Sequence, residues 1–150
     1  MAWNPYGLDQ IAHRLVQRAL QIDADQKIRG DSCLREVYEM RESVAYGLER
    51  FWGEQLRHDS KGQKKNATYW KETWATLVET LNQAGVILPN DADANTMAKK
   101  LWGDTPLNDA GVKLSHENRQ LALAVLTQLC NCMVWWTQRY KKSEETVLRN

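Results

Sequence analysis

The sequence predicts an all-α protein: a single-domain bundle of about five helices, with a long and central C-terminal helix. Apolar residues recur at the 3.6-residue spacing of a helix through several long segments. No segment alternates apolar and polar residues over a useful length, and the only strand-like run, "GVILP", is too short and isolated to pair. A chain of 150 residues, 43% of them apolar, can bury roughly 70% of its unfolded surface in one core. We therefore expect one domain, residues 1–150.

The first half of the chain predicts two long helices. Residues 8–29 carry one apolar stripe, and "RGDS" ends that helix with a glycine. Residues 32–57 repeat the same spacing without a break in the apolar pattern. Gly47 falls inside this second helix, where glycine costs up to about 1 kcal/mol relative to alanine. We expect it to allow close approach of a neighbouring helix or of Trp52.

The second half predicts three more helices, over residues 68–84, 95–102 and 115–142. The third helix buries a stripe that includes Trp70 and Trp74, and the fourth ends at Gly103. In the fifth, Ser115 is a suitable N-cap, and the apolar residues from Leu121 onward surround the helix, as expected for the most buried element. Residues 143–150 are expected to fray.

Aromatic residues and charges are unevenly distributed. Seven Trp and five Tyr against one Phe predict a core built around large aromatic side chains. The net charge is +1, but residues 55–71 contain five basic residues and one acidic residue, whereas residues 72–112 contain two and six. The stretch "RHDSKGQKKN", residues 57–66, is therefore the densest positive segment, and we expect it to be a loop between two helices. A nearly neutral total argues against coating nucleic acid by bulk charge but leaves room for a local basic site.

The three cysteines indicate neither a disulfide nor a metal pair. Cys130 and Cys132 lie two residues apart on a predicted helix, so their side chains point about 200° apart, and Cys33 is distant in sequence. We expect three small buried hydrophobic residues in a reduced compartment. The N-terminal "MAWNPYGLDQ" lacks the apolar segment of a signal peptide, and no apolar run is long enough to span a membrane. A soluble, cytoplasmic protein is expected.

Catalytic signatures are absent from the sequence. There is no Gly-rich phosphate loop, nucleophile elbow or HExxH motif. The three histidines, for which we expect surface or capping roles, are His13, His58 and His116. The paired carboxylates, Glu36 with Glu39 and Glu144 with Glu145, are expected to face solvent. The sequence thus predicts a protein that is not an enzyme and needs no cofactor.

One segment, "DADAN", imitates the first half of a calcium loop. The sixth position of that loop should be Gly and is Thr96, and the twelfth should be Glu and is Trp102. We reject calcium binding, expect no metal site, and interpret Asp93 or Asn95 as a helix N-cap.

Binding is the function that the remaining residues favour. The candidate nucleic-acid-binding residues are Arg14, Arg18, Arg57, Lys61, Lys64, Lys65, Lys71, Lys99, Lys100, Arg139, Lys141 and Lys142. Tyr69, Trp135 and Tyr140 lie near some of these in sequence, and a positive groove with stacking aromatics suits single-stranded nucleic acid. Alternatively, the lysine-rich loop is simply solvated, and the basic residues that end the last helix compensate its dipole. Adjacent Trp135 and Trp136 cannot both face the core, so we place an interface at Trp135, Trp136 and Tyr140.

The chain resembles the α-helical small subunits of CRISPR RNA-guided effector complexes, both Cascade-type and type III. The resemblance covers the whole chain in its general design, which is about 150 residues and about five helices. It includes three segments: "LREVYEMRESVAYGLERFWGEQL", the basic turn into "YWKETWATLVETL", and "LALAVLTQLCNCMVWWTQRYKK". It implies a non-catalytic subunit of an antiviral defence complex, present in more than one copy beside other subunits. Its basic face would hold the backbone of displaced single-stranded DNA or of the guide RNA–target duplex. Many members are more basic than +1, so affinity would arise mainly in the assembled complex.

Two hypotheses remain open at the level of sequence. The first is this nucleic-acid-binding structural subunit. The second is a helical protein–protein interaction or adaptor module without a nucleic-acid role, which would use the exposed tryptophan and the acidic stretch 72–112.

Overall fold

The computed structural model describes residues 7–25 and 32–149, with side chains up to Tyr140. Its elements are α1 (Leu8–Asp25), α2 (Cys33–Ser43), the short 3-10 helix η1 (Val44–Tyr46), α3 (Leu48–Ser60), α4 (Lys64–Gln83), α5 (Ala94–Leu101) and α6 (His116–Arg149). No strand occurs among these described residues. The prediction of an all-α bundle is confirmed.

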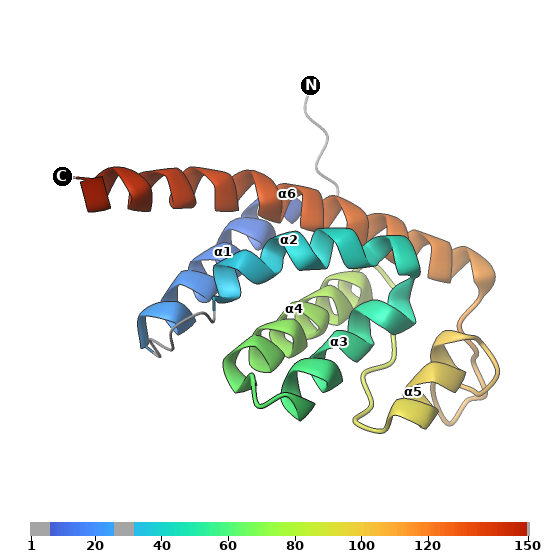
Figure 1. Ribbon diagram of the computed structural model, residues 1–150. Helices are drawn as coiled ribbons and strands as arrows, with labels where there is room; N and C mark the ends of the chain where they lie inside the picture. Colours follow the sequence, from blue (N-terminus) through green and yellow to red (C-terminus); the bar gives the residue numbers. More distant parts are fainter. Residues whose placement is uncertain (1–6, 26–31, 150) are drawn as a thin grey trace.

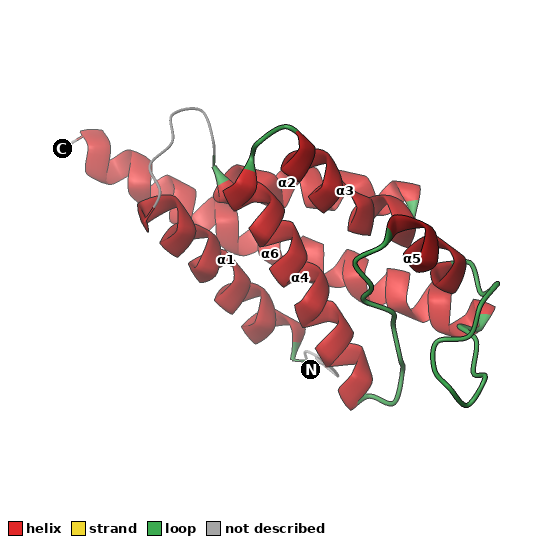
Figure 2. Ribbon diagram, turned by 90° about the horizontal axis from the view of Figure 1, so that it is seen from below, coloured by secondary structure: helices red, strands yellow, loops and turns green. Residues whose placement is uncertain are grey.

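The helices form two layers with the core between them. The long helix α6 lies across α1 and α2, while α3 and α4 pack together on the opposite side (Figure 1). Seen from below in Figure 2, α5 lies beside α3 at the end away from the α3–α4 turn. Both α1 and α2 contact α4 as well as α6, so they join the two layers.

Large aromatic side chains fill the core, as the composition predicts. Phe51, Tyr69, Trp70 and Trp74 are all at most 1% exposed. The rings of Phe51 and Trp70 are 4.9 Å apart between centroids. Two of the buried polar tips have backbone acceptors: Tyr69 donates to the carbonyl of Leu15 at 2.8 Å, and the Trp74 indole N–H donates to that of Pro89 at 3.1 Å. Burial of these rings therefore leaves no indole or phenol group of Tyr69 or Trp74 unsatisfied.

The predicted helix over residues 32–57 is wrong, because it is interrupted at Gly47. This glycine has φ of +98°, a conformation that residues with a Cβ rarely adopt and that no α-helix contains. Helix α2 ends at Ser43, η1 follows, and α3 begins directly after Gly47. Gly47 thus redirects the chain between two helices instead of allowing a close approach within one.

The predicted basic loop at residues 57–66 is also largely helical. Helix α3 continues to Ser60 and α4 begins at Lys64, so the connection is only Lys61–Gln63. Gly62, with φ of +76°, allows this three-residue turn. The fourth of the predicted helices begins after Asp93, whose carboxylate accepts from the Thr96 N–H as the expected N-cap.

The bounds of the first and last helices differ from those predicted. The predicted residues 26–29 of the first helix lie outside the described residues. At α6, the Ser115 hydroxyl accepts from the Asn118 N–H, which confirms the expected cap. The helix then continues to Arg149, so its backbone is helical through most of the segment that we expected to fray.

Candidate functional site

The basic stretch forms a compact corner where α3 turns into α4. We define the α3–α4 corner as the cations Arg57, Lys61, Lys64 and Lys71 together with the carboxylates Glu54 and Asp59. Arg57 pairs with Glu54 at 2.7 Å, and Lys64 pairs with Asp59 at 2.8 Å. Lys61 is exposed in the turn, and Lys71 is exposed two helical turns after Lys64 on the same face of α4. Four cations thus stand against two carboxylates.

The neighbouring charges shift the pKa values of two groups of the corner, Asp59 and Arg57, toward their charged forms. The hydrogen bond from Lys64, with the nearby charges of Lys64 and Lys71, lowers the pKa of Asp59. The hydrogen bond to Glu54 raises the pKa of Arg57. Helix α4 begins here with no acidic residue in its first turn and no side-chain cap at Gln63, so its positive dipole end adds to the lysines. The corner is therefore a locally positive surface that can attract an anion.

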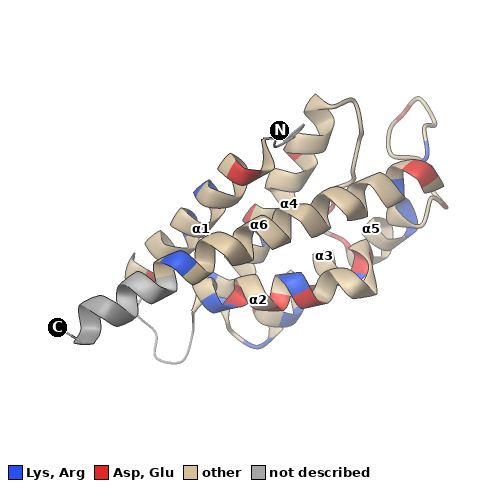
Figure 3. Ribbon diagram, turned by 90° about the horizontal axis from the view of Figure 1, so that it is seen from above, with Lys and Arg blue, Asp and Glu red and all other residues tan. Residues whose placement is uncertain are grey.

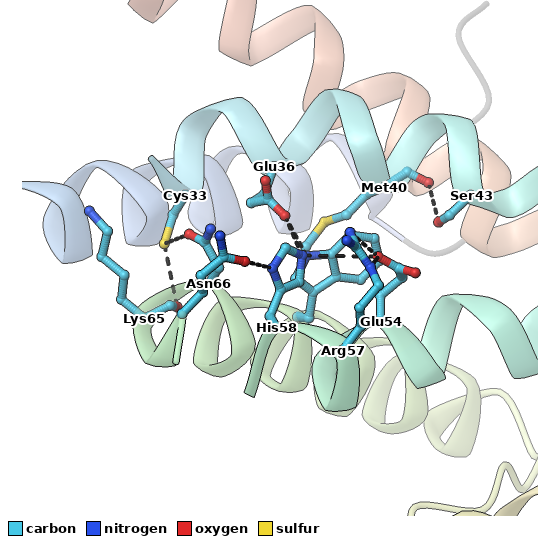
Figure 4. Close-up of polar contacts among 11 residues, drawn as sticks. Cys33, Glu36, Met40, Ser43, Glu54, Arg57, His58, Lys65 and Asn66 are labelled. Atoms are coloured by element: carbon cyan, nitrogen blue, oxygen red, sulfur yellow. Dashed lines mark hydrogen bonds and ion pairs between the residues drawn. The ribbon is translucent and has the colours of Figure 1, made fainter. Parts of the chain in front are cut away.

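A buried polar cluster attaches this corner to α2 (Figure 4). His58 is 4% exposed, and its Nε2 lies 2.7 Å from Glu36 Oε1, close enough for an ion pair although not aligned as a hydrogen bond. The Trp70 indole N–H donates to the same carboxylate oxygen at 2.9 Å. On its other side His58 Nδ1 contacts Gln63 Oε1 at 2.6 Å. Residues of α2, α3 and α4 thus hold the α3–α4 turn in a fixed place.

Two expectations about this region are wrong. Glu36 is 8% exposed instead of facing solvent, and His58 is not a surface residue. A signal existed in the sequence: His58 follows Phe51 and Gln55 at the spacing of one helix face, and that face is the buried one of α3. The charge of His58 and Glu36 argued for exposure, but each side chain offers the other a partner within the core.

Lys65 does not belong to the basic surface. It is 4% exposed, and its ammonium lies 3.3 Å from Asp23 at the end of α1. The same carboxylate accepts from the N–H groups of Cys33 and Leu34 at 2.8 and 3.1 Å, which satisfies the start of α2. Asp23 therefore joins the ends of three helices, and Lys65 completes that junction instead of offering a contact for a ligand.

Apart from Arg18, which borders the same hollow as Lys64, the other predicted basic residues are scattered over the molecule. Arg18 makes two hydrogen bonds to Glu72 at 2.9 and 3.0 Å, and Lys100 pairs with Asp91 at 2.9 Å. Arg14 borders a shallow depression between α1 and α4, and Lys99 is exposed on α5. Lys141 and Lys142 are in α6, beyond the residues whose side chains the structure describes.

The predicted residues therefore do not form one continuous basic face. Figures 1 and 2 place α5 at the opposite end of α3 from the turn, and α6 lies on the far layer. Of the described candidates, the structure brings Arg57, Lys61, Lys64 and Lys71 together at the corner, and Arg18 and the buried Lys65 line a hollow beside Lys64 between α1 and α4.

The aromatic candidates have three different environments. Tyr69, considered as a stacking platform, is fully buried. Trp135 is 47% exposed, and the guanidinium carbon of Arg139 lies 3.6 Å from its ring centroid. Trp136 and Tyr140 are half-buried against α1, where His13 contacts the Tyr140 hydroxyl and Asp9 accepts from the Trp136 indole N–H at 3.1 Å. Of the predicted interface residues, Trp135 is thus the one most open to a partner.

Metal ligands, thiols and helix length among the described residues are further indicators of function. No group of three or more His, Cys, Asp or Glu residues among them is arranged to hold a metal ion. All three cysteines are free, and burial raises the pKa of the Cys130 thiol to about 12, so it is unreactive. None of the helices in the described part combines the length and apolar character needed to cross a membrane.

Compared with models of protein families, with curated proteins and with solved structures, the chain matches none of them. The α3–α4 corner and the exposed surface of α6 are therefore interpreted from their own geometry.

Proposed function

We propose that the chain is a non-catalytic, nucleic-acid-binding small subunit of a cytoplasmic CRISPR RNA-guided effector complex. The observation that carries the proposal is the α3–α4 corner, where four cations gather at the uncapped N-terminus of a 20-residue helix. The resemblance to CRISPR small subunits in the helices that flank this corner supports the same proposal.

The corner would hold nucleic acid by its phosphates. Lys64 and Lys71 are seven residues apart on α4, so their Cα atoms are about 10.5 Å apart along the helix axis. A phosphate backbone lying along this exposed face can contact both ammonium groups, with Lys61 at the turn as a third. The Lys64–Asp59 ion pair is exposed, and exposed pairs are weak enough for Lys64 to exchange its partner for a phosphate. Contacts from these cations to phosphates carry no sequence information, so binding would follow the backbone and not the sequence.

The proposal is tested by fluorescence anisotropy with a labelled single-stranded oligonucleotide and with a guide–target RNA–DNA duplex. The Lys61→Glu, Lys64→Glu, Lys71→Glu triple variant should lose most of the binding. With about three phosphate contacts, log K for a single strand should fall with log salt at a slope of about −2.

A matched control changes three exposed cations elsewhere: Arg14→Glu, Lys99→Glu and Lys113→Glu. Both triple variants change the net charge equally, from +1 to −5, so bulk charge affects them alike. The dissociation constant of the control variant for the oligonucleotide should be at least about tenfold lower than that of the corner variant. Equal binding by the two variants, or binding that ignores salt, would refute the role of the corner.

A protein–protein adaptor without nucleic acid is the second candidate function. It is favoured by the exposure of Trp135 on α6, since exposed tryptophans often anchor protein interfaces. The same anisotropy measurement separates the two functions, because an adaptor would bind neither oligonucleotide.

A further inference from the structure

The outward side of α6 carries no charge over five helical turns. From Leu121 to Gln138 the sequence "LALAVLTQLCNCMVWWTQ" contains no Asp, Glu, Lys, Arg or His. The exposed residues of this segment define the α6 stripe: Leu121, Ala124, Gln128, Asn131, Trp135 and Gln138. In Figure 3 the middle of α6 is correspondingly free of acidic and basic residues.

The spacing and composition of the α6 stripe are typical of a helix face that is buried against another helix. Its members alternate at spacings of three and four residues, the pattern of a helix that packs along another helix. Exposed helix faces ordinarily carry charged residues, whereas three of these six residues are apolar and three are uncharged amides. No described element lies on the side of α6 opposite α1 and α2 (Figure 1). A hollow of about 350 Å³ beside Trp135, lined by Asp9, Asn131 and Cys132, can receive a side chain.

We propose that the α6 stripe is a homotypic interface, on which α6 of a second copy of this chain packs antiparallel. A symmetric interface brings like surfaces together, so charged stripes would repel their own copies, but amides both donate and accept. An antiparallel pair centred on the stripe places Gln128 of each copy opposite Asn131 of the other. Arg41 already donates to Asn131 Oδ1, which leaves the Asn131 amide N–H groups to face the Gln128 oxygen.

The sizes of the side chains favour the antiparallel direction. In an antiparallel pair centred between Gln128 and Asn131, the large Trp135 of one copy lies opposite the small Ala124 of the other. A parallel pair would instead set Trp135 against Trp135 and Ala124 against Ala124, with crowding at one level and a gap at the other. Large residues opposite small ones pack two helices closely along the segment, which is about 27 Å long at 1.5 Å per residue.

The charges at the two ends of the stripe favour the same direction. Glu117 precedes the stripe and Arg139 follows it, and both are exposed. In the antiparallel pair, Glu117 of one copy lies within about one helical turn of Arg139 of the other, whereas a parallel pair opposes like charges. The uncharged α6 residues of the stripe and the oppositely charged residues at its ends are thus both complementary to a second copy. The proposal depends on this surface alone and does not require binding of nucleic acid.

The test is sedimentation equilibrium of the full chain without nucleic acid. The wild-type protein should approach twice the 17.4 kDa mass of one chain as its concentration rises. The Trp135→Glu variant should raise the dimer dissociation constant at least about tenfold, as expected for a buried aromatic anchor. Trp102→Glu is the matched control, because Trp102 is 52% exposed but lies outside α6. It should dimerise like the wild type, and far-UV circular dichroism should show equal helicity for all of these proteins.

A charge exchange tests the direction of packing. Glu117→Arg and Arg139→Glu should each weaken the dimer, and the double variant should regain wild-type affinity because opposite charges meet again across the pair. A wild-type chain that remains monomeric at its highest soluble concentration would overturn the proposal, and so would a dimer indifferent to Trp135→Glu. A double variant as weak as the single ones would overturn the antiparallel arrangement.

Discussion

Removal of the Glu36 side chain should destabilise the protein strongly, although the residue lies on a surface-forming helix and carries a charge. In the Glu36→Ala variant the Trp70 indole N–H loses its acceptor, and a buried unsatisfied donor costs about 1–3 kcal/mol. His58 loses the carboxylate 2.7 Å from its Nε2, which leaves a second buried polar group without its neighbour at a similar cost. The carboxylate of Glu54, 4.0 Å from the same nitrogen, remains as a second partner. We therefore expect a loss of about 3 kcal/mol in the free energy of unfolding from the Trp70 and His58 groups together.

The assay is equilibrium unfolding in urea, followed by tryptophan fluorescence and far-UV circular dichroism. Glu36→Gln keeps an oxygen acceptor for Trp70 and loses only the charge, so it should cost about 1 kcal/mol. Glu39→Ala, an exposed residue of the same helix, should stay within about 0.5 kcal/mol of wild type. A double-mutant cycle with His58→Ala should give a coupling between about 0.5 and 3 kcal/mol. If Glu36→Ala and Glu39→Ala proved equally stable, the buried cluster would not stabilise the corner as argued.

Two further predictions concern the backbone and the thiols. Gly47→Ala should destabilise the protein by about 1–2 kcal/mol, because φ is +98° and the new Cβ would lie 3.0 Å from Glu49 Oε2. Gly53→Ala, within α3 and with open space at its Cβ, should instead stabilise by about 0.5–1 kcal/mol, and urea unfolding that gave both changes the same sign would contradict this assignment. With a pKa of about 12, the native Cys130 thiol is ionised to only about one part in 10⁴ at pH 8, so a colorimetric thiol reagent should leave it unmodified until urea exposes all three cysteines. Rapid reaction of Cys130 in the native protein, located by peptide mapping, would show that this region opens.

The helical class and the aromatic core were predictable, because both depend on local periodicity. The stripe through Trp70 and Trp74 marks the buried side of α4 whatever its neighbours are, and burial confirms it. The break at Gly47 was not predictable in this way, since the apolar pattern continues across it and periodicity does not report φ. The start of α4 at Lys64 was missed for a related reason. The first residues of this helix are lysines, and a lysine-rich segment is typical of a solvated loop.

The candidate site was only partly predictable, because tertiary pairing decides which charges are available. Arg57, Lys61, Lys64 and Lys71 gather as the charge distribution suggested. Lys65 has the same sequence context as Lys64, yet its partner Asp23 is 42 residues away and draws it into the interior. Glu36 and His58 are likewise buried by each other, and a single sequence without contacts does not reveal such pairs.

The packing of α6 on α1 has a consequence for the order of folding. These are the first and last helices of the described chain, so the layer they form depends on contacts between distant parts of the sequence. During synthesis, α1 and α2 leave the ribosome long before α6. Their apolar faces that pack on α6 therefore stay exposed to solvent, or bound to a chaperone, until α6 has been synthesised. A truncated polypeptide that ended before His116 would lack α6, which covers the apolar faces of α1 and α2, and should aggregate.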